Sequence, residues 1–236
     1  MNSPMLHVFE NTDQVMEGLA IWLASQSKAH IQNHDVSYWA ISGGKTPIAL
    51  YQLLAKGRVD IDWASVNLFL ADERDVFAKD PRSNYGLIEE VLLSHLLPPP
   101  GRVVGWQTLT DPRDALAQYR RQLTGLPRPQ GFPQLDVALL GMGDDGHTAS
   151  IFPSSPQEAA SGWVAYGPGP LCPRFTLTHS LLTHAREVVF LVTGKAKSSR
   201  VVECLRDSNC DLPAAKVSRA APSVHWFLDQ ESAHDL

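Results

Sequence analysis

Short stretches rich in β-branched and aromatic residues recur along the chain, separated by segments in which apolar residues return at helical spacing. The first kind of stretch predicts strands, and a run that is apolar throughout predicts a strand buried on both faces. Val137–Leu140 is the clearest case, because Asp136 and Gly141 bound it. The predicted strands are Leu6–Phe9, Val36–Ile41, Val66–Leu70, Val103–Val104, Val137–Leu140, Trp163–Tyr166, Arg174–Thr178, Val188–Val192 and Val224–Leu228.

Helical spacing appears between these strands. Val15, Leu19 and Leu23 share one face of a helix that either Asn11 or Thr12 can cap. Further helices are predicted at Ile48–Leu54, after Ser83-Asn84, at Asp111–Leu123, before Leu205 and after Asp211. Strands that alternate with helices in this way predict an α/β fold with a mostly parallel, doubly wound sheet.

Two segments depart from the simple alternation. Arg174–Thr178 alternates polar and apolar residues, which predicts an edge strand or a half-buried strand. Ser154–Pro173 is rich in glycine and proline and is predicted to be a loop that frames a pocket, with the short strand Trp163–Tyr166 within it. No long linker interrupts the 236 residues, so we expect a single domain over residues 1–236.

Glycine and a cation follow the strand at Val36–Ile41. The sequence there is Ser42-Gly43-Gly44-Lys45-Thr46-Pro47, a tight turn that leads into a helix, with Thr46 as a predicted N-cap. The free N–H groups and the dipole of a helix N-terminus favour an anion, and Lys45 adds a positive charge. A plain strand-to-helix connection would also fit this turn, because the spacing of a Walker loop is missing.

Ionisable residues also follow two other predicted strands. Asp72, Glu73, Arg74 and Asp75 come directly after Val66–Leu70, and Asp144, Asp145 and His147 come among glycines after Val137–Leu140. Open α/β sheets bind ligands at the carboxyl ends of their strands, so we expect these clusters to share one pocket. A solvated loop or an ordinary glycine turn would explain either cluster alone, but not their repetition.

Composition and charge narrow the class of protein. The net charge is -5 with scattered basic residues, which argues against a nucleic-acid partner held by charge. Three cysteines without a C-x-x-C pair indicate a reduced protein, and we expect it to be cytoplasmic. No signal peptide, membrane-spanning segment, nucleotide fingerprint or clustered metal ligands can be recognised, so we expect no membrane partner, no cofactor and no metal.

Several motifs together resemble the 6-phosphogluconolactonase family, which is grouped with glucosamine-6-phosphate isomerases. They are SGGKTP (42–47), ADERDV (71–76), SNY (83–85), LLGMGDDGHTASIFP (139–153), PRFTLT (173–178), VTGKAK (192–197) and LPAA (212–215). The resemblance spans nearly the whole chain. It implies a Rossmann-like three-layer α/β/α sandwich and hydrolysis of 6-phospho-D-glucono-1,5-lactone in the oxidative pentose phosphate pathway.

A phosphosugar lactone needs a dianion site and a way to activate water. Gly43, Gly44, Lys45, Thr46, Arg174 and Lys197 are the predicted phosphate-binding residues. His147 is the predicted general base, because histidine exchanges protons near neutral pH. Either Asp72 or Asp145 could fix its tautomer, and Arg74 or glycine N–H groups could stabilise the oxyanion.

Two other functions compete with this interpretation. A deaminase or isomerase with the same fold would use a carboxylate to move a proton between carbons, but such deaminases typically carry an aromatic residue at the position of Arg74. A non-catalytic sugar-phosphate sensor usually has a DNA-binding segment, which the sequence lacks. The predicted protein acts on a small molecule as a monomer or a homodimer.

Overall fold

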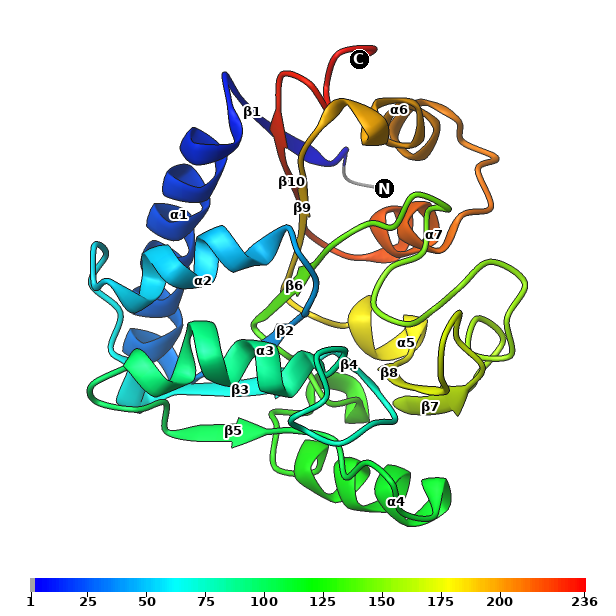
Figure 1. Ribbon diagram of the computed structural model, residues 1–236. Helices are drawn as coiled ribbons and strands as arrows, with labels where there is room; N and C mark the ends of the chain where they lie inside the picture. The colour runs from blue at the N-terminus through cyan, green and yellow to red at the C-terminus, as the bar shows by residue number, and fades with distance from the viewer. Residues whose placement is uncertain (1–2) are drawn as a thin grey trace.

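The computed structural model describes residues 3–236, except for the side chain of Gln130, and within that range a seven-stranded parallel sheet forms the centre of the fold (Figure 1). Neighbouring strands follow the order β1-β10-β9-β6-β2-β3-β5, and each pair is parallel. The strands are β1 (Met5–Phe9), β2 (Ser37–Ile41), β3 (Val66–Leu70), β5 (Arg102–Val104), β6 (Val137–Leu140), β9 (Glu187–Val192) and β10 (Val224–Asp229).

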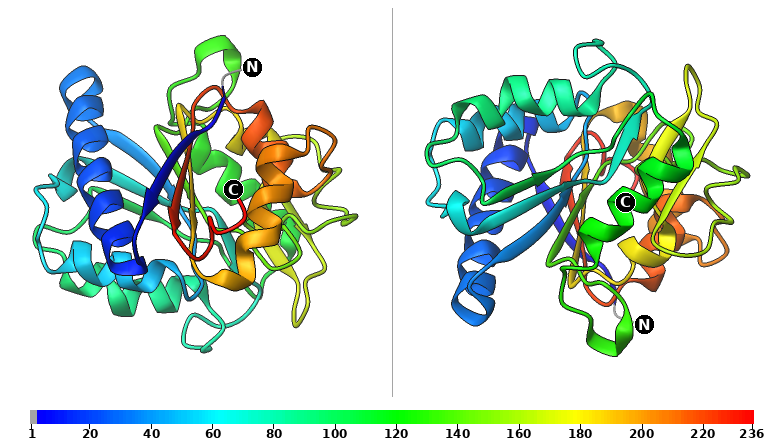
Figure 2. Two further views of the ribbon diagram at one scale, coloured as in Figure 1. Left: turned by 90° about the horizontal axis from the view of Figure 1, so that it is seen from above. Right: turned by 90° about the horizontal axis from the view of Figure 1, so that it is seen from below.

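Helices cover both faces of this sheet. One face carries α1 (Thr12–His34), α2 (Pro47–Ala55) and α3 (Asn84–Val91) (Figure 2). The other carries α4 (Pro112–Leu123), α6 (Ser198–Arg206) and α7 (Pro213–Ala220), and α5 (His179–Leu182) packs against α7. Short 3-10 helices are η1 (Trp63–Ser65), η2 (Leu93–His95), η3 (Pro129–Gly131) and η4 (Lys195–Lys197). The predicted three-layer α/β/α sandwich is confirmed.

The direction of winding reverses in the middle of the sheet. From β2 the chain moves outward through β3 to β5, and it then returns to β6 on the other side of β2. Because parallel crossovers are right-handed, this reversal places the later helices on the opposite face. The point between β2 and β6 is therefore a topological switch point, the place where ligands bind in open α/β sheets.

A second sheet stands beside the carboxyl ends of the first. Its antiparallel strands follow the order β4 (Asp72–Arg74), β8 (Arg174–Leu177) and β7 (Val164–Gly167). The prediction that Arg174–Thr178 forms an edge strand or a half-buried strand is wrong, because β8 is central and buried at every position. Oγ1 of Thr176, for example, accepts the backbone N–H of Ser150 at 3.2 Å inside the protein, so the alternation does not mark a face in water.

The structure also decides which residue caps α1. The side chain of Asn11 accepts a hydrogen bond from the N–H of Gln14 at 3.0 Å. Thr12 is already the first residue of the helix, and its hydroxyl donates to Asp229 at 2.9 Å. Of the two predicted caps, Asn11 is correct.

Histidines are buried at the amino ends of the strands, away from the switch point. His30 of α1 is 9% exposed, and its Nδ1 lies 3.3 Å from Oγ of Ser37. Burial lowers the pKa of His30, the nearby Arg186 lowers it further, and Asp136 and Glu187 oppose the shift. The folded protein therefore keeps this ring neutral at a pH where an unfolded chain would protonate it.

We predict that the free energy of unfolding falls as the pH drops below about 6.5, the ordinary histidine pKa. The unfolded chain binds the proton first, so protonation favours unfolding, by at most about 1.4 kcal/mol per pH unit for one group. His30→Gln should flatten the fall between about pH 7 and 5.5 in urea titrations. His95→Gln, at an exposed site in η2, is the control and should leave the slope unchanged. An unaltered slope in His30→Gln would contradict the assignment.

Candidate active site

A pocket of about 430 Å³ lies at the carboxyl ends of β2, β3 and β6, at the switch point. Nine of the predicted site residues line it together: Gly43, Gly44, Lys45, Thr46, Asp72, Arg74, His147, Arg174 and Lys197. Asp145 stands behind His147 and is not among the lining residues. The clusters predicted from separate strand ends therefore do meet in one pocket.

The turn after β2 forms one wall of the pocket. Gly44 has a φ of +102°, which favours glycine, and a Cβ on Gly43 would lie 2.0 Å from Oδ1 of Asn84. The predicted capping by Thr46 is wrong: within the described chain its side chain makes no capping hydrogen bond, and its backbone is already helical. The start of α2 is therefore left without a side-chain acceptor, as an anion site requires.

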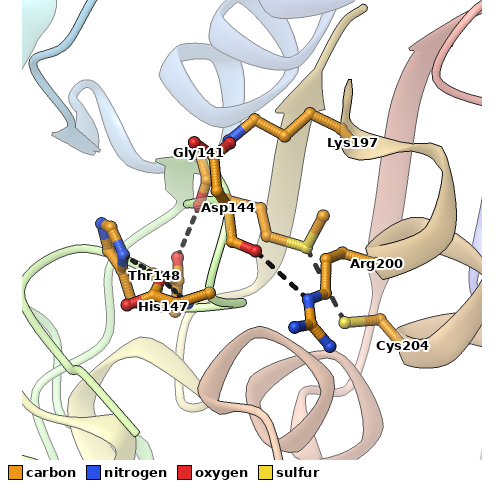
Figure 3. Close-up of polar contacts among 9 residues, drawn as sticks. Gly141, Asp144, His147, Thr148, Lys197, Arg200 and Cys204 are labelled. Carbon is orange, nitrogen blue, oxygen red and sulfur yellow. Dashed lines mark hydrogen bonds and ion pairs between the residues drawn. The ribbon is translucent and has the colours of Figure 1, made fainter. Parts of the chain in front are cut away.

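The loop after β6 forms the opposite wall and carries His147 (Figure 3). A Cβ on Gly143 would lie 2.1 Å from Nδ1 of His147, so glycine is needed there to make room for the ring. Thr148 Oγ1 donates to the carbonyl of Gly141 at 2.9 Å, and the N–H of Ala214 donates to the carbonyl of Gly146 at 3.1 Å. The first bond closes the loop on itself, and the second ties the loop to the start of α7.

Asp145 holds the histidine. Its Oδ1 lies 2.5 Å from Nδ1 of His147 and also accepts the backbone N–H of His147 at 3.1 Å. A carboxylate accepts hydrogen bonds, so Nδ1 carries the proton and Nε2 is left as the proton acceptor. The ring also packs against Phe152, with centroids 4.6 Å apart. Partial burial raises the pKa of Asp145, but the hydrogen bonds from His147 outweigh it, so the pKa ends below its ordinary range.

Asp72 does not hold the histidine by any hydrogen bond among the described residues. It is 6% exposed, and its carboxylate accepts from Oγ of Ser150 at 2.6 Å and from Nδ2 of Asn84 at 3.2 Å. Sequence reasoning missed Ser150 and used Asn84 only to mark the start of a helix and as part of the SNY motif. The motif SNY contained the signal, because Ser83 caps α3 and leaves the amide of Asn84 to face the pocket.

Glu73 points away from the pocket. Its carboxylate accepts the backbone N–H groups of Arg74, Asn84 and Tyr85, each at 2.7 Å, and the hydroxyl of Ser83 at 3.1 Å. Burial raises its pKa despite these hydrogen bonds. The carboxylate thus anchors the start of α3. The expectation that the whole cluster after β3 belongs to the pocket holds for Asp72 and Arg74 but not for Glu73 or Asp75.

Two arginines face each other across the small sheet. Arg74 and Arg174 are direct partners in β4 and β8, and like charges so placed repel each other. Burial, followed by the charge of Arg74, lowers the pKa of Arg174. Nε of each arginine is buried without a hydrogen-bond partner among the described residues. A bound anion would offset both the repulsion and the lost hydrogen bonds.

The other two cations differ in their surroundings. Lys45 is exposed at the rim, whereas Lys197 reaches the pocket from η4 and forms an ion pair with Asp144.

Among residues 3–236, no group of three or more histidine, cysteine, aspartate or glutamate side chains is arranged to hold a metal ion. None of the helices described is both long and apolar enough to cross a membrane.

Comparison with known proteins gives consistent matches over nearly the whole chain. Residues 10–226 match the sequence model of a family described as glucosamine-6-phosphate isomerases/6-phosphogluconolactonase. A probable 6-phosphogluconolactonase of Schizosaccharomyces pombe is 31% identical, over 98% of this chain and 95% of that protein. A 6-phosphogluconolactonase of Synechocystis is 30% identical, over 99% of both.

Solved structures agree with the sequence matches. The 6-phosphogluconolactonase of Trypanosoma brucei superposes with a TM-score of 0.87 at 29% identity, over 100% of both chains. The enzyme of Leishmania guyanensis gives a TM-score of 0.87 at 27% identity, over 100% of this chain and 99% of that one. A monomeric glucosamine-6-phosphate deaminase shares the fold at 16% identity, with a TM-score of 0.82 over 98% of this chain and 99% of that one. By the match of its sequence over residues 10–226 and its likeness to full-length relatives, this chain belongs to the glucosamine-6-phosphate isomerase/6-phosphogluconolactonase family.

Proposed function

We propose that this protein hydrolyses 6-phospho-D-glucono-1,5-lactone to 6-phospho-D-gluconate, a step of the oxidative pentose phosphate pathway. The observation that carries the proposal is that His147, paired with Asp145 behind it, lines a pocket that also holds four cationic side chains. The histidine can activate water, and the cations can bind a phosphate dianion. The relatives that match over nearly the whole chain carry the name of this enzyme.

The reaction follows from these groups. Nε2 of His147 takes a proton from water while the oxygen attacks C1 of the lactone, and the carbonyl oxygen becomes an oxyanion. Arg74 and the N–H groups of the glycine-rich turns are the donors proposed to stabilise it. The intermediate then expels the ring oxygen, which receives the proton back from His147. The carboxylic acid product releases a proton to solvent.

The phosphate is proposed to bind at Arg174, Lys197, Lys45 and the turn from Gly43 to Thr46. Arginine offers a planar fork that matches phosphate oxygens, and lysine offers a point charge. The buried, unpartnered Nε of Arg174 supports this assignment. Binding energy from a phosphate far from the reacting carbon can align the lactone for attack.

The setting of this activity is part of the proposal. We expect residues 1–236 to act as one sugar-phosphate lactonase domain in the cytoplasm, as a monomer or a homodimer, without nucleic-acid or membrane partners. We expect the reaction to need no organic cofactor or metal, because His147 can activate the water. The decisive experiment mixes purified protein with freshly prepared lactone and follows acid release above the spontaneous rate.

A deaminase or isomerase activity is the second candidate, because Asp72 is a pocket carboxylate that does not hold His147. A carboxylate in this position could move a proton between sugar carbons. The assay is incubation with glucosamine 6-phosphate and measurement of ammonia and fructose 6-phosphate. Release of ammonia with no acceleration of lactone hydrolysis would replace the proposed function.

We predict that His147→Gln lowers kcat by about 10²–10⁴-fold with little change in KM, because glutamine cannot accept the proton. Initial rates of acid release, corrected for spontaneous hydrolysis at each pH, measure the effect. If the variant kept more than about a tenth of the kcat, the base would have to be another group, with Asp72 the first to test.

We predict that Asp145→Asn also lowers kcat, by between about 10-fold and 10⁴-fold. An amide N–H would face Nδ1 and favour the tautomer in which Nε2 carries the proton and cannot act as a base. Because the pKa of Asp145 is lowered, its carboxylate stays ionised down to acidic pH, and the loss should persist across about pH 5–8. Asp72→Asn is the matched control. The assignment of Asp145 would be contradicted if Asp72→Asn lowered kcat as much as Asp145→Asn does, or more.

We predict that Arg174→Ala mainly raises KM for the phosphorylated lactone, as expected when substrate binding is lost. With unphosphorylated gluconolactone, the variant and the original protein should differ little. Because Arg174 is buried, thermal melting must show that the variant folds, and Lys45→Ala at the exposed rim repeats the test without that concern. Equal hydrolysis of both lactones by the original protein would remove phosphate from the mechanism.

A further inference from the structure

Lys197 differs from the other cations of the pocket. Of Lys45, Arg74, Arg174 and Lys197, only Lys197 has an ion pair with a carboxylate among the described residues. Its Nζ contacts Oδ1 of Asp144, and the side chain of Lys197 is 20% exposed whereas that of Asp144 is 86% exposed (Figure 3). The partner of Lys197 is therefore an anion that stands largely in water.

The fold holds Asp144 in this position. Nε of Arg200 donates to the backbone carbonyl of Asp144 at 3.2 Å, and Nη1 of Arg200 is paired with Oε2 of Glu203 at 2.5 Å. Lys197 ends η4 and Arg200 lies in the first turn of α6, so both contacts to Asp144 come from one helix start. The ion pair therefore joins the loop that carries His147 to the helix that carries Lys197.

We propose that Asp144 stays paired with the ammonium group of Lys197 until the substrate phosphate replaces it, and that this pairing weakens phosphate binding. The inference rests on the proposed function, because it assigns Lys197 to the phosphate. On exchange, Lys197 loses a carboxylate and gains a phosphate, while Asp144 returns to water. Asp144 thus opposes binding twice, first as a competitor for the lysine and then as a negative charge beside a dianion.

The size of the effect follows from the exposure of Asp144. An exposed ion pair contributes little, so removing its carboxylate should tighten phosphate binding by about two- to fivefold. Salt screens such contacts, with a Debye length of about 10 Å at 0.1 M. The gain should therefore shrink as ionic strength rises. Weaker phosphate binding also favours release of the product, which carries the same phosphate group.

The test uses Asp144→Asn and calorimetric titration with 6-phosphogluconate and with gluconate. We expect the Kd for 6-phosphogluconate to fall about two- to fivefold at low salt and the Kd for gluconate to change little. Asp60→Asn, at an exposed site before β3, carries the same charge change and should leave both Kd values unaltered. In a Lys197→Met background, the gain from Asp144→Asn should be smaller, because the exchange has lost its cation and only the repulsion between Asp144 and the dianion remains.

Three results would overturn the inference: an unchanged or higher Kd for 6-phosphogluconate in Asp144→Asn, an equal gain for gluconate, or a full gain that persists in Lys197→Met. Each leaves the proposed function standing if the original protein binds 6-phosphogluconate and hydrolyses the lactone. If the original protein does neither, the proposed function itself fails. Melting curves of Asp144→Asn confirm that the exposed substitution leaves the fold intact.

Discussion

The candidate site depends on the reversal of strand order between β2 and β6 in an all-parallel sheet. Chain segments that leave these two strands turn toward opposite faces, so a crevice opens between them at their carboxyl ends. The turn from Gly43 to Thr46 lines one side of the crevice and the loop that carries His147 lines the other. A site that joins an anion-binding turn to a proton acceptor follows from this arrangement of strands.

The small antiparallel sheet completes the crevice at some cost in stability. It brings Arg74 opposite Arg174 and buries Asp72 beside them, so charges of both signs are removed from water. Asp72 is compensated by Ser150 and Asn84, whereas Nε of each arginine is without a partner among the described residues. Buried donors without a partner on these cations destabilise the fold and favour binding of a phosphate.

Four carboxylates near the site have four different environments, and these set what each can do. Asp145 orients the histidine, Asp72 lies in the pocket between two donors, and Glu73 anchors the start of α3. Asp144 stands in water against Lys197. Residue type alone does not separate these roles, because each depends on which donors the surrounding elements supply.

The sequence by itself determined the class of the fold and the gathering of the site. Apolar runs that alternate with helices predict a parallel sheet, and parallel strands necessarily bring their carboxyl ends to one edge. His147, Lys45 and Arg74 could therefore be placed in one pocket from the residues that follow each strand. Gly44 also marked a turn whose positive φ favours glycine, and Gly143 marked one where a Cβ would meet the ring of His147.

Only the tertiary structure decided which of these groups touch one another. The sequence left Asp72 and Asp145 as equal candidates for the partner of His147, because both follow buried strands. The structure selects Asp145, whose carboxylate contacts the ring at 2.5 Å, whereas Ser150 and Asn84 donate to Asp72. Likewise, the alternation of Arg174–Thr178 predicted an edge strand or a half-buried strand, and the structure places β8 between β4 and β7 and buries every residue of it. Spacing along a chain sets the periodicity of side chains, but what each face meets depends on elements that are distant in sequence.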